Sequence, residues 1–178
     1  MLRARPFALL VVILAAAASR LVPHPPNFAP IGAMALFGGA YFSDRRQAFL
    51  VPLAAMFLSD LVIGLHSTIA VVYGSFALIV CIGFWLRRRR TVSLVAGATL
   101  AGSVVFFVIT NFGVWALGSW YPKTLSGLMT AYIQAIPFFR NTVAGDLFYA
   151  SVLFGGFALL ERLFPALREA SEVVGNRT

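Results

Sequence analysis

Six apolar segments follow one another along this chain with few charges inside them, and this pattern decides the solvent in which the chain can fold. The segments lie near residues 7–22, 28–43, 47–65, 68–86, 92–118 and 143–164. A helix needs about 20 apolar residues to cross the hydrocarbon core, or about 17 at the short end of the range. Charged residues are 11% of the 178 residues, against roughly 25% in soluble domains. We therefore predict one all-α integral membrane domain over residues 1–178, a six-transmembrane-helix bundle.

The 14 basic side chains are distributed unevenly between the two sides of such a bundle. Eleven arginines fall in or beside the loops at 1–6, 44–46, 87–91 and 165–178, which share one side. The other side has Arg20, Lys123 and Arg140. Because loops rich in Lys and Arg stay in the cytoplasm, we expect both termini to be cytoplasmic in a multi-pass protein of the bacterial inner membrane. The positive charge is thus a topology signal that predicts no nucleic-acid partner, with anionic lipid or a cytoplasmic partner as secondary uses.

The first apolar segment has two interpretations. Arg3 and Arg5, a short apolar core and the run AAAAS ending at Ser19 are typical of a cleaved signal peptide. Arg20 and a proline cluster follow at once, and Ala15 with Ser19 would give a close-packing face in a retained helix. Both interpretations stay open at this point.

Polar residues other than arginine fall mainly on the predicted outer side, so we place the functional site there. Four prolines between residues 23 and 30 make a stiff loop that would present His24 and Asn27 outward, or would only end one helix and start the next. The candidate substrate-binding residues are His24, Asn27, Asp60, His66, Tyr73, Asn111, Trp115, Tyr132, Arg140, Asn141 and Asp146.

Two aspartates on this side need separate arguments. Asp60 lies about five residues before the end of the third segment, roughly 7 Å below the outer boundary at 1.5 Å per residue. A carboxylate at that depth should face the bundle interior with a partner, for which His24, His66 and Arg140 are candidates, unless it snorkels into water. Asp146 either belongs to the site or stabilises the start of the sixth helix through the helix dipole, and Asn141 or Thr142 would cap that helix.

A broken amphipathic stretch separates the fifth and sixth segments. Pro122, Gly127 and Pro137 interrupt it, and apolar residues recur between them at helical spacing. This pattern predicts a short outer helix lying on the bundle mouth. Trp115 and Trp120 beside it fit an aromatic belt at the membrane interface or a lid that encloses a ligand.

Several chemistries can be set aside. The chain has no G-x-x-x-x-G-K-[ST] and no H-E-x-x-H motif, and no serine occupies a nucleophile-elbow pattern, so we expect no enzyme and no cofactor. His24 and His66 lie about forty residues apart, so we expect no metal site, although the two could still meet in space. The single Cys81 excludes a disulfide framework and a thiolate cluster within one chain.

Four stretches carry a resemblance to known membrane proteins: PHPPNFAPIGAMALFGGAYF (23–42), LSDLVIG (58–64), TNFGVW (110–115) and AIPFFRNTVAGDLFY (135–149). With six short helices in 178 residues, they resemble the substrate-binding S-components of energy-coupling-factor transporters. Within that group they are most similar to small bacterial proteins related to solitary cobalamin-transport S-components. The resemblance implies a vitamin-type ligand in an outward cavity, with His24, Asp60 and Arg140 at positions similar to the family's polar site residues.

One residue departs from that pattern. Some members of the cobalamin group place a cysteine in the outer half of the fourth helix, where its sulfur ligates cobalt. Here Cys81 lies close to the Arg87–Arg90 run, and Tyr73 occupies the outer half. We therefore expect no thiolate ligation of cobalt, which argues against cobalamin as the substrate, although a neutral histidine could serve as the ligand instead.

Together these features predict a transport protein that binds a small organic solute, vitamin-like or cofactor-like and a corrinoid among the options, at its outer face and moves it inward. Because the chain has no ATPase motif, a cytoplasmic or transmembrane energising module is the expected partner besides the lipid bilayer, unless transport is facilitated diffusion. Two alternatives stay open. One is a non-transporting scaffold or assembly subunit, and the other is a metal-coupled or proton-coupled carrier that uses Asp60 and the histidines.

Overall fold

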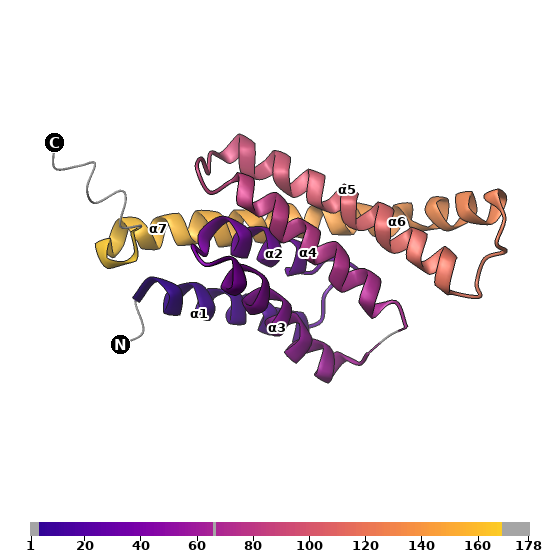
Figure 1. The fold of residues 1–178 in the computed structure, drawn as a ribbon, viewed down its shortest axis with the longest axis horizontal. Helices are drawn as coiled ribbons and strands as arrows, with labels where there is room; N and C mark the ends of the chain where they lie inside the picture. Colours follow the sequence, from indigo (N-terminus) through magenta and orange to yellow (C-terminus); the bar gives the residue numbers. More distant parts are fainter. Residues whose placement is uncertain (1–3, 66, 169–178) are drawn as a thin grey trace.

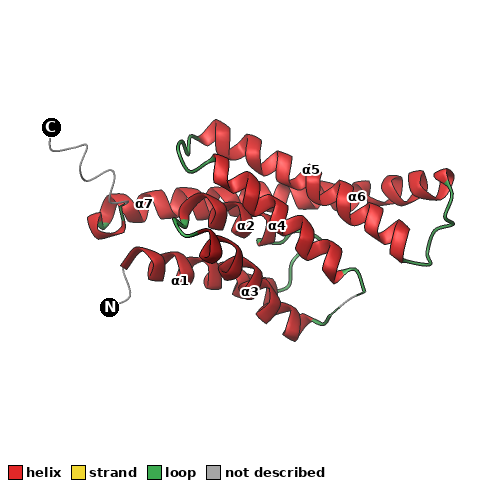
Figure 2. Cartoon of the chain, viewed as in Figure 1, coloured by secondary structure: helices red, strands yellow, loops and turns green. Residues whose placement is uncertain are grey.

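Every regular element that the structure describes is a helix (Figure 2). The structure is a computed structural model that describes residues 4–65 and 67–168. The elements are α1 (Ala4–Ala18), η1 (Ser19–Leu21), α2 (Ile31–Tyr41), α3 (Arg45–Ile63), α4 (Ile69–Trp85), α5 (Val92–Leu117), α6 (Leu125–Ala150), η2 (Ser151–Gly155), α7 (Gly156–Leu163) and η3 (Pro165–Leu167). The all-α prediction is therefore confirmed for the described part of the chain.

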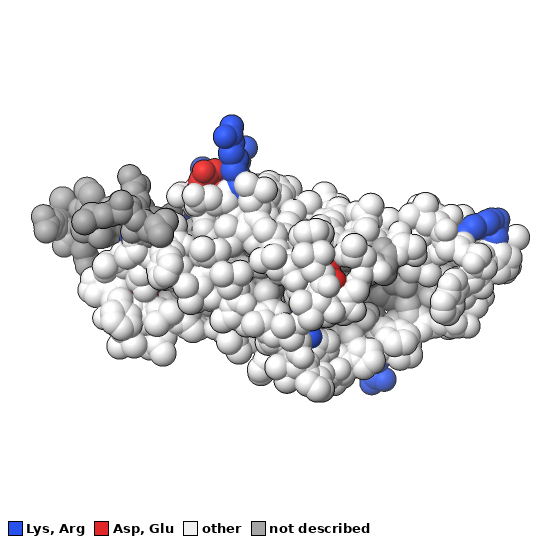
Figure 3. Space-filling view, turned by 90° about the horizontal axis from the view of Figure 1, so that it is seen from below, with Lys and Arg blue, Asp and Glu red and all other residues white. Residues whose placement is uncertain are grey.

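Four helical stretches among the described residues are long and apolar enough to cross a membrane. They are Ala4–Leu21, Arg45–Ile63, Val92–Leu117 and Leu125–Leu163. Large apolar side chains such as Val62, Trp85 and Val92 are more than two-thirds exposed. On the face seen in Figure 3, charged side chains are few and most of the surface is uncharged. A surface of this kind suits lipid rather than water, which supports the membrane class predicted above.

Helix α2 is the short centre of the bundle. Its 11 residues span about 17 Å at 1.5 Å per residue, about half of the roughly 30 Å hydrocarbon thickness. Nine of these residues, from Ala33 to Tyr41, are buried. A helix that is apolar all round belongs in a core, and α2 packs against α1, α3, α4, α5 and α6. The second predicted span, 28–43, is therefore a loop followed by a half-length helix.

Helices α2 and α4 approach each other through a pair of glycines. A Cβ added at Gly39 would overlap the carbonyl oxygen of Val80 and lie 2.9 Å from the Gly83 Cα. A Cβ added at Gly83 would overlap the carbonyl oxygen of Leu36. Small residues at helix crossings let backbones pack closely in membrane proteins, so this pair fixes the position of the central helix.

Helix α6 differs from the sequence prediction. The predicted short outer helix and the predicted helix at 143–164 form one 39-residue stretch from Leu125 to Leu163, with the π-helical turn η2 inside it. Pro137 lies inside α6 instead of ending it, as prolines often do in transmembrane helices. The stretch measures about 58 Å. In Figure 1, α5 and α6 form a hairpin, and because of this length the hairpin extends past α3 and α4.

Both described ends of the chain meet at the end of the bundle that carries Arg5 and the Arg87–Arg90 run, which we call the arginine-rich end. Arg5 Nη1 lies 2.6 Å from Glu161 Oε1 and also donates to the carbonyl oxygen of Leu167. Leu9 and Ile13 of α1 are buried in the core. In this structure the first helix therefore packs as part of the bundle.

The same end holds the C-terminus of α2. Arg87 Nε donates to the carbonyl oxygen of Gly39 at 2.9 Å, and Arg87 Nη2 donates to that of Phe42 at 2.7 Å. Arg90 Nη2 donates to the carbonyl oxygen of Ala40 at 3.1 Å. Cations at a helix C-terminus satisfy its last carbonyls and complement its dipole. The arginine run therefore anchors α2, whose N-terminus points toward the middle of the bundle.

Candidate functional site

The proline-rich loop between η1 and α2 is fastened to α6. Asn141 Nδ2 donates to the carbonyl oxygen of Pro26 at 2.9 Å. The Phe28 ring lies 5.7 Å from the Phe148 ring and 5.8 Å from the Tyr149 ring, between centroids. Asn27 has a φ of 62°, a left-handed conformation that asparagine tolerates better than most residues. The loop is thus held against the bundle and does more than connect two helices.

Under this loop lies a cavity of about 390 Å³. Its lining residues are Arg20, His24, Asn27, Ala29, Ile31, Gly32, Ile63, Val72, Phe76, Phe106, Thr142 and Asp146. Apolar and aromatic walls with a few polar groups are typical of small-molecule sites. The structure brings together three predicted site residues here: His24, Asn27 and Asp146.

Asp146 is the most unusual residue of this wall. It is only 5% exposed, and Ser103 Oγ donates to its Oδ2 at 2.7 Å. A Cβ added at Gly32, in the first turn of α2, would overlap its carboxylate and lie 2.9 Å from its Cγ. The positive end of the α2 dipole therefore faces this carboxylate. Asp146 forms no ion pair with any residue in the ranges 4–65 and 67–168.

A second cavity of about 300 Å³ adjoins the first, because Asn27, Phe106 and Thr142 line both. Its wall includes Asn111 from α5, whose Nδ2 donates to the carbonyl oxygen of Phe107 at 2.7 Å. The remaining lining residues are mostly apolar or aromatic side chains of α5 and α6. The two cavities together form what we call the outer site, after the side of the bundle on which the sequence predicts it.

Asp60 is buried as predicted, but two of its three predicted partners, His24 and Arg140, are wrong. Arg20 Nη1 lies 2.7 Å from Asp60 Oδ1, and Tyr73 OH donates to Asp60 Oδ2 at 2.8 Å. Arg20 also donates to Ser59 Oγ. Among the described candidates, His24 lies on the cavity wall and Arg140 is exposed on α6, and neither pairs with Asp60. From the sequence we placed Arg20 on the outer side but did not identify it as the partner of Asp60. The signal was available, because a cation at the end of an apolar segment is expected to pair with a carboxylate.

The other predicted residues lie away from the cavities or outside the described part. Trp115 Nε1 donates to the carbonyl oxygen of Pro122 at 3.0 Å, and Tyr132 OH donates to that of Val108 at 2.7 Å. Both contacts hold the α5–α6 hairpin together. Arg140 lines neither cavity of the outer site, and His66 lies outside the described residues.

The outer site has the chemistry of a binding site. Its polar groups are a guanidinium, an imidazole, amides and a buried carboxylate, set among apolar walls. Within the part of the chain that the structure describes, no three His, Cys, Asp or Glu side chains gather in a way that could hold a metal ion. The arrangement can hold a small solute by hydrogen bonds at its polar groups and by aromatic contact at Phe76 and Phe106.

Comparison with known proteins gives a family for the chain. Residues 1–167 match a family described as "Family of unknown function (DUF6580)", and the chain belongs to that family. The chain matches no curated protein and no solved structure.

Proposed function

We propose that this protein is a multi-pass transport protein of the bacterial inner membrane that binds a small organic solute in the outer site and carries it inward. The observation that carries the proposal is Asp146, a buried carboxylate on the wall of a cavity. An ionisable residue inside a membrane-spanning segment is costly and marks a functional site by default. Vitamin-like or cofactor-like solutes fit the resemblance to S-components, and a separate energising module is the proposed partner.

A six-crossing arrangement with both ends in the cytoplasm supports this direction of transport. In this arrangement the loop at 22–30 and α2 complete the second crossing together, and α4 completes the fourth. The contact between Arg5 and Glu161 agrees with an even number of crossings. Because Lys and Arg favour the cytoplasmic side, the arginine-rich end faces the cytoplasm and the outer site opens to the periplasmic side.

The size of the site points to a compact ligand. The cavities of about 390 and 300 Å³ lie at or near the small end of the roughly 300–1,000 Å³ range of ligand pockets. A corrinoid is much larger than the drug-sized molecules that fill such pockets, so a smaller solute fits better. A hydrogen-bond donor or cationic group on the solute would face Asp146, and an apolar part would lie on Phe76 and Phe106.

Mass spectrometry of the purified protein tests this proposal. Small molecules released from the wild-type protein are compared with those from Asp146→Asn. We expect one compound to co-purify with the wild type and to fall about tenfold or more in the variant, about 1.4 kcal/mol of binding. Asp44→Asn is the matched control, because Asp44 is an exposed N-cap at the arginine-rich end and asparagine caps helices equally well.

Two results would contradict the transport proposal. A wild-type protein that releases no compound would favour the scaffold alternative, in which the outer polar groups only bind one another. A compound retained equally by Asp146→Asn would place the ligand somewhere other than the outer site.

A proton-coupled carrier is the second candidate, and the same residue favours it. Asp146 has one hydrogen-bond donor in Ser103 and no ionic partner among the described residues. Carboxyl groups in such positions serve as proton relays in pumps and transporters. Uptake of the released compound into proteoliposomes tests this candidate, because an imposed pH gradient should accelerate uptake by the wild type and leave uptake by Asp146→Asn unchanged.

A further inference from the structure

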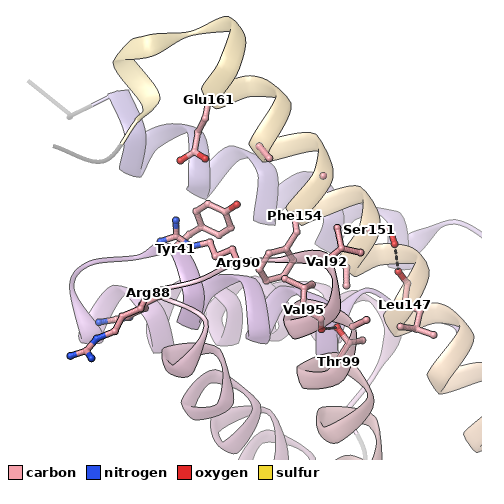
Figure 4. Close-up of a pocket in the computed structure, with 15 residues that line it drawn as sticks. Tyr41, Arg88, Arg90, Val92, Val95, Thr99, Leu147, Ser151, Phe154 and Glu161 are labelled. Atoms are coloured by element: carbon pink, nitrogen blue, oxygen red, sulfur yellow. Dashed lines mark hydrogen bonds between the residues drawn. The ribbon is translucent and has the colours of Figure 1, made fainter. Parts of the chain in front are cut away.

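A cavity of about 750 Å³ lies at the arginine-rich end of the bundle, and it is larger than either cavity of the outer site. Residues of α5, α6, η2 and α7 form most of its wall, together with Tyr41 and the arginine run. In Figure 4, Glu161, Tyr41 and Arg90 line one end, while Val95, Phe154 and Leu147 continue along the helices. We call this space the arginine-end cavity.

The arginine-end cavity extends deep into the membrane-spanning part. Its wall runs along α5 from Val92 to Thr99 and along the last helix from Glu161 back to Leu147. At 1.5 Å per residue these distances are about 10 Å and about 21 Å, against a hydrocarbon thickness of roughly 30 Å. A ligand that fills it must therefore be apolar over most of its length.

Charge is concentrated at the mouth of this cavity. Arg87, Arg88 and Arg90 line it, and Arg88 is exposed. In Figure 4, Arg88 extends from that end, away from α7. The carboxylate of Glu161 is paired with Arg5 at 2.6 Å, so it does not cancel the positive potential. The mouth therefore favours an anionic group.

The π-helical turn η2 opens the apolar wall. Gly155 and Ser151 of this turn line the cavity, and a Cβ added at Gly155 would meet nothing within 4 Å. Turns of this kind inside long helices are rare and occur frequently at functional sites. The break in the regular helix thus coincides with the arginine-end cavity.

We propose that the arginine-end cavity binds an anionic phospholipid. The phosphate group lies in the positive potential of Arg87, Arg88 and Arg90, and one acyl chain follows the wall from Val95 to Leu147. Charge complementarity at the mouth selects an anionic head group, as basic pockets between transmembrane helices do on the cytoplasmic side. The apolar depth selects a lipid over a soluble phosphate. The mouth of this site lies at the arginine-rich end, and its lining residues are different from those of the outer site, although its inner end at Leu147 is next to Asp146 in the chain.

Native mass spectrometry with defined lipids tests the proposal on the full-length protein. Phosphatidylglycerol and phosphatidylcholine with the same acyl chains are added in equal amounts, and inorganic phosphate is added in a separate sample. We expect the wild type to retain phosphatidylglycerol preferentially. Arg88→Gln should reduce that preference about fivefold, because an arginine near an anionic lipid contributes about 1 kcal/mol. Arg89→Gln is the matched control, since Arg89 belongs to the same run but does not line the cavity.

A second pair of variants tests the apolar depth. Gly155→Leu should fill the cavity and lower lipid retention, whereas Gly156→Leu, which has the same free space but lies outside the lining, should not. Equal retention of both lipids by the wild type would overturn the proposal in favour of ordinary annular lipid. Binding of phosphate alone with the same dependence on Arg88 would overturn the lipid as the ligand. If Gly155→Leu does not fold, the comparison of Arg88→Gln with Arg89→Gln decides.

Discussion

Arg20 and Asp60 form a buried ion pair, with Arg20 Nη1 2.7 Å from Asp60 Oδ1. The arginine comes from η1 at the end of the first helix, and the aspartate from the C-terminal part of α3. Tyr73 OH completes the environment of the carboxylate from α4. The pair therefore joins three helices behind the outer site, and it orients the one guanidinium that lines the first cavity.

Removing both charges of this pair should destabilise the protein by less than the sum of the two single changes. Arg20→Gln or Asp60→Asn alone leaves the other charge buried, which costs about 3–5 kcal/mol. The double variant leaves no unpaired charge, so we expect its loss of unfolding free energy to be smaller than the sum by about 1–3 kcal/mol. Denaturant unfolding in detergent of the wild type, the two single variants and the double variant measures this difference as a double-mutant cycle.

The exposed Arg46 supplies the control, because Arg46→Gln removes an arginine with little burial and should change the unfolding free energy by less than about 0.5 kcal/mol. Strictly additive effects of Arg20→Gln and Asp60→Asn would mean that the two charges are not coupled. In that case Asp60 is an interfacial carboxylate in contact with water.

The glycine contact between α2 and α4 should be sensitive to a single methyl group. Gly83→Ala places a Cβ against the carbonyl oxygen of Leu36, and overpacking of this kind costs about 1–3 kcal/mol. Gly74→Ala on the same helix adds the same methyl group with nothing within 4 Å and gains helix propensity. Thermal unfolding should therefore separate the two variants, with Gly83→Ala melting lower. Equal melting temperatures would mean that α2 and α4 are not in close backbone contact.

Gly32→Ala should disturb the outer site without removing any of its polar groups. The added Cβ would overlap the Asp146 carboxylate, so the carboxylate must move. We expect retention of the co-purified compound to fall about tenfold, as for Asp146→Asn, which is about 1.4 kcal/mol. Gly97→Ala in α5 meets nothing within 4 Å and should retain the compound fully. A Gly32→Ala protein with wild-type retention would show that the position of Asp146 does not matter for binding.

The helical membrane class could be predicted from the sequence. Long apolar segments with few charges favour lipid over water as the solvent, and this preference does not depend on how the helices pack against one another. The sequence prediction misjudged α2 because the window at 28–43 joined three loop residues to an 11-residue helix. The useful signal was that the residues from Ala33 to Tyr41 are small or apolar on all sides, as in a buried helix. At Pro137 the sequence predicted a break where the structure has a continuous helix. Proline ends helices in water more often than in lipid.

The candidate site was predicted in part. His24, Asn27 and Asp146 do line one cavity, and sorting polar residues by side brought them together. The partner of Asp60 could not be deduced in the same way, because Arg20 reaches it only through the packing of η1 on α3. A residue 40 positions away in sequence becomes a neighbour only once the helices pack.

The last prediction concerns which end of the bundle faces outward. Ser119 is exposed in the loop between α5 and α6, and Arg89 is exposed at the opposite end of α5. The 26 residues of α5 measure about 39 Å, which is longer than the roughly 30 Å hydrocarbon core, so we expect the two positions to lie on opposite sides of the membrane. With Cys81 replaced by alanine, Ser119→Cys should react with a membrane-impermeant maleimide in intact spheroplasts, and Arg89→Cys should react only after the membrane is permeabilised. Labelling of Arg89→Cys from outside would invert the protein, place the outer site in the cytoplasm, and reverse the proposed direction of transport.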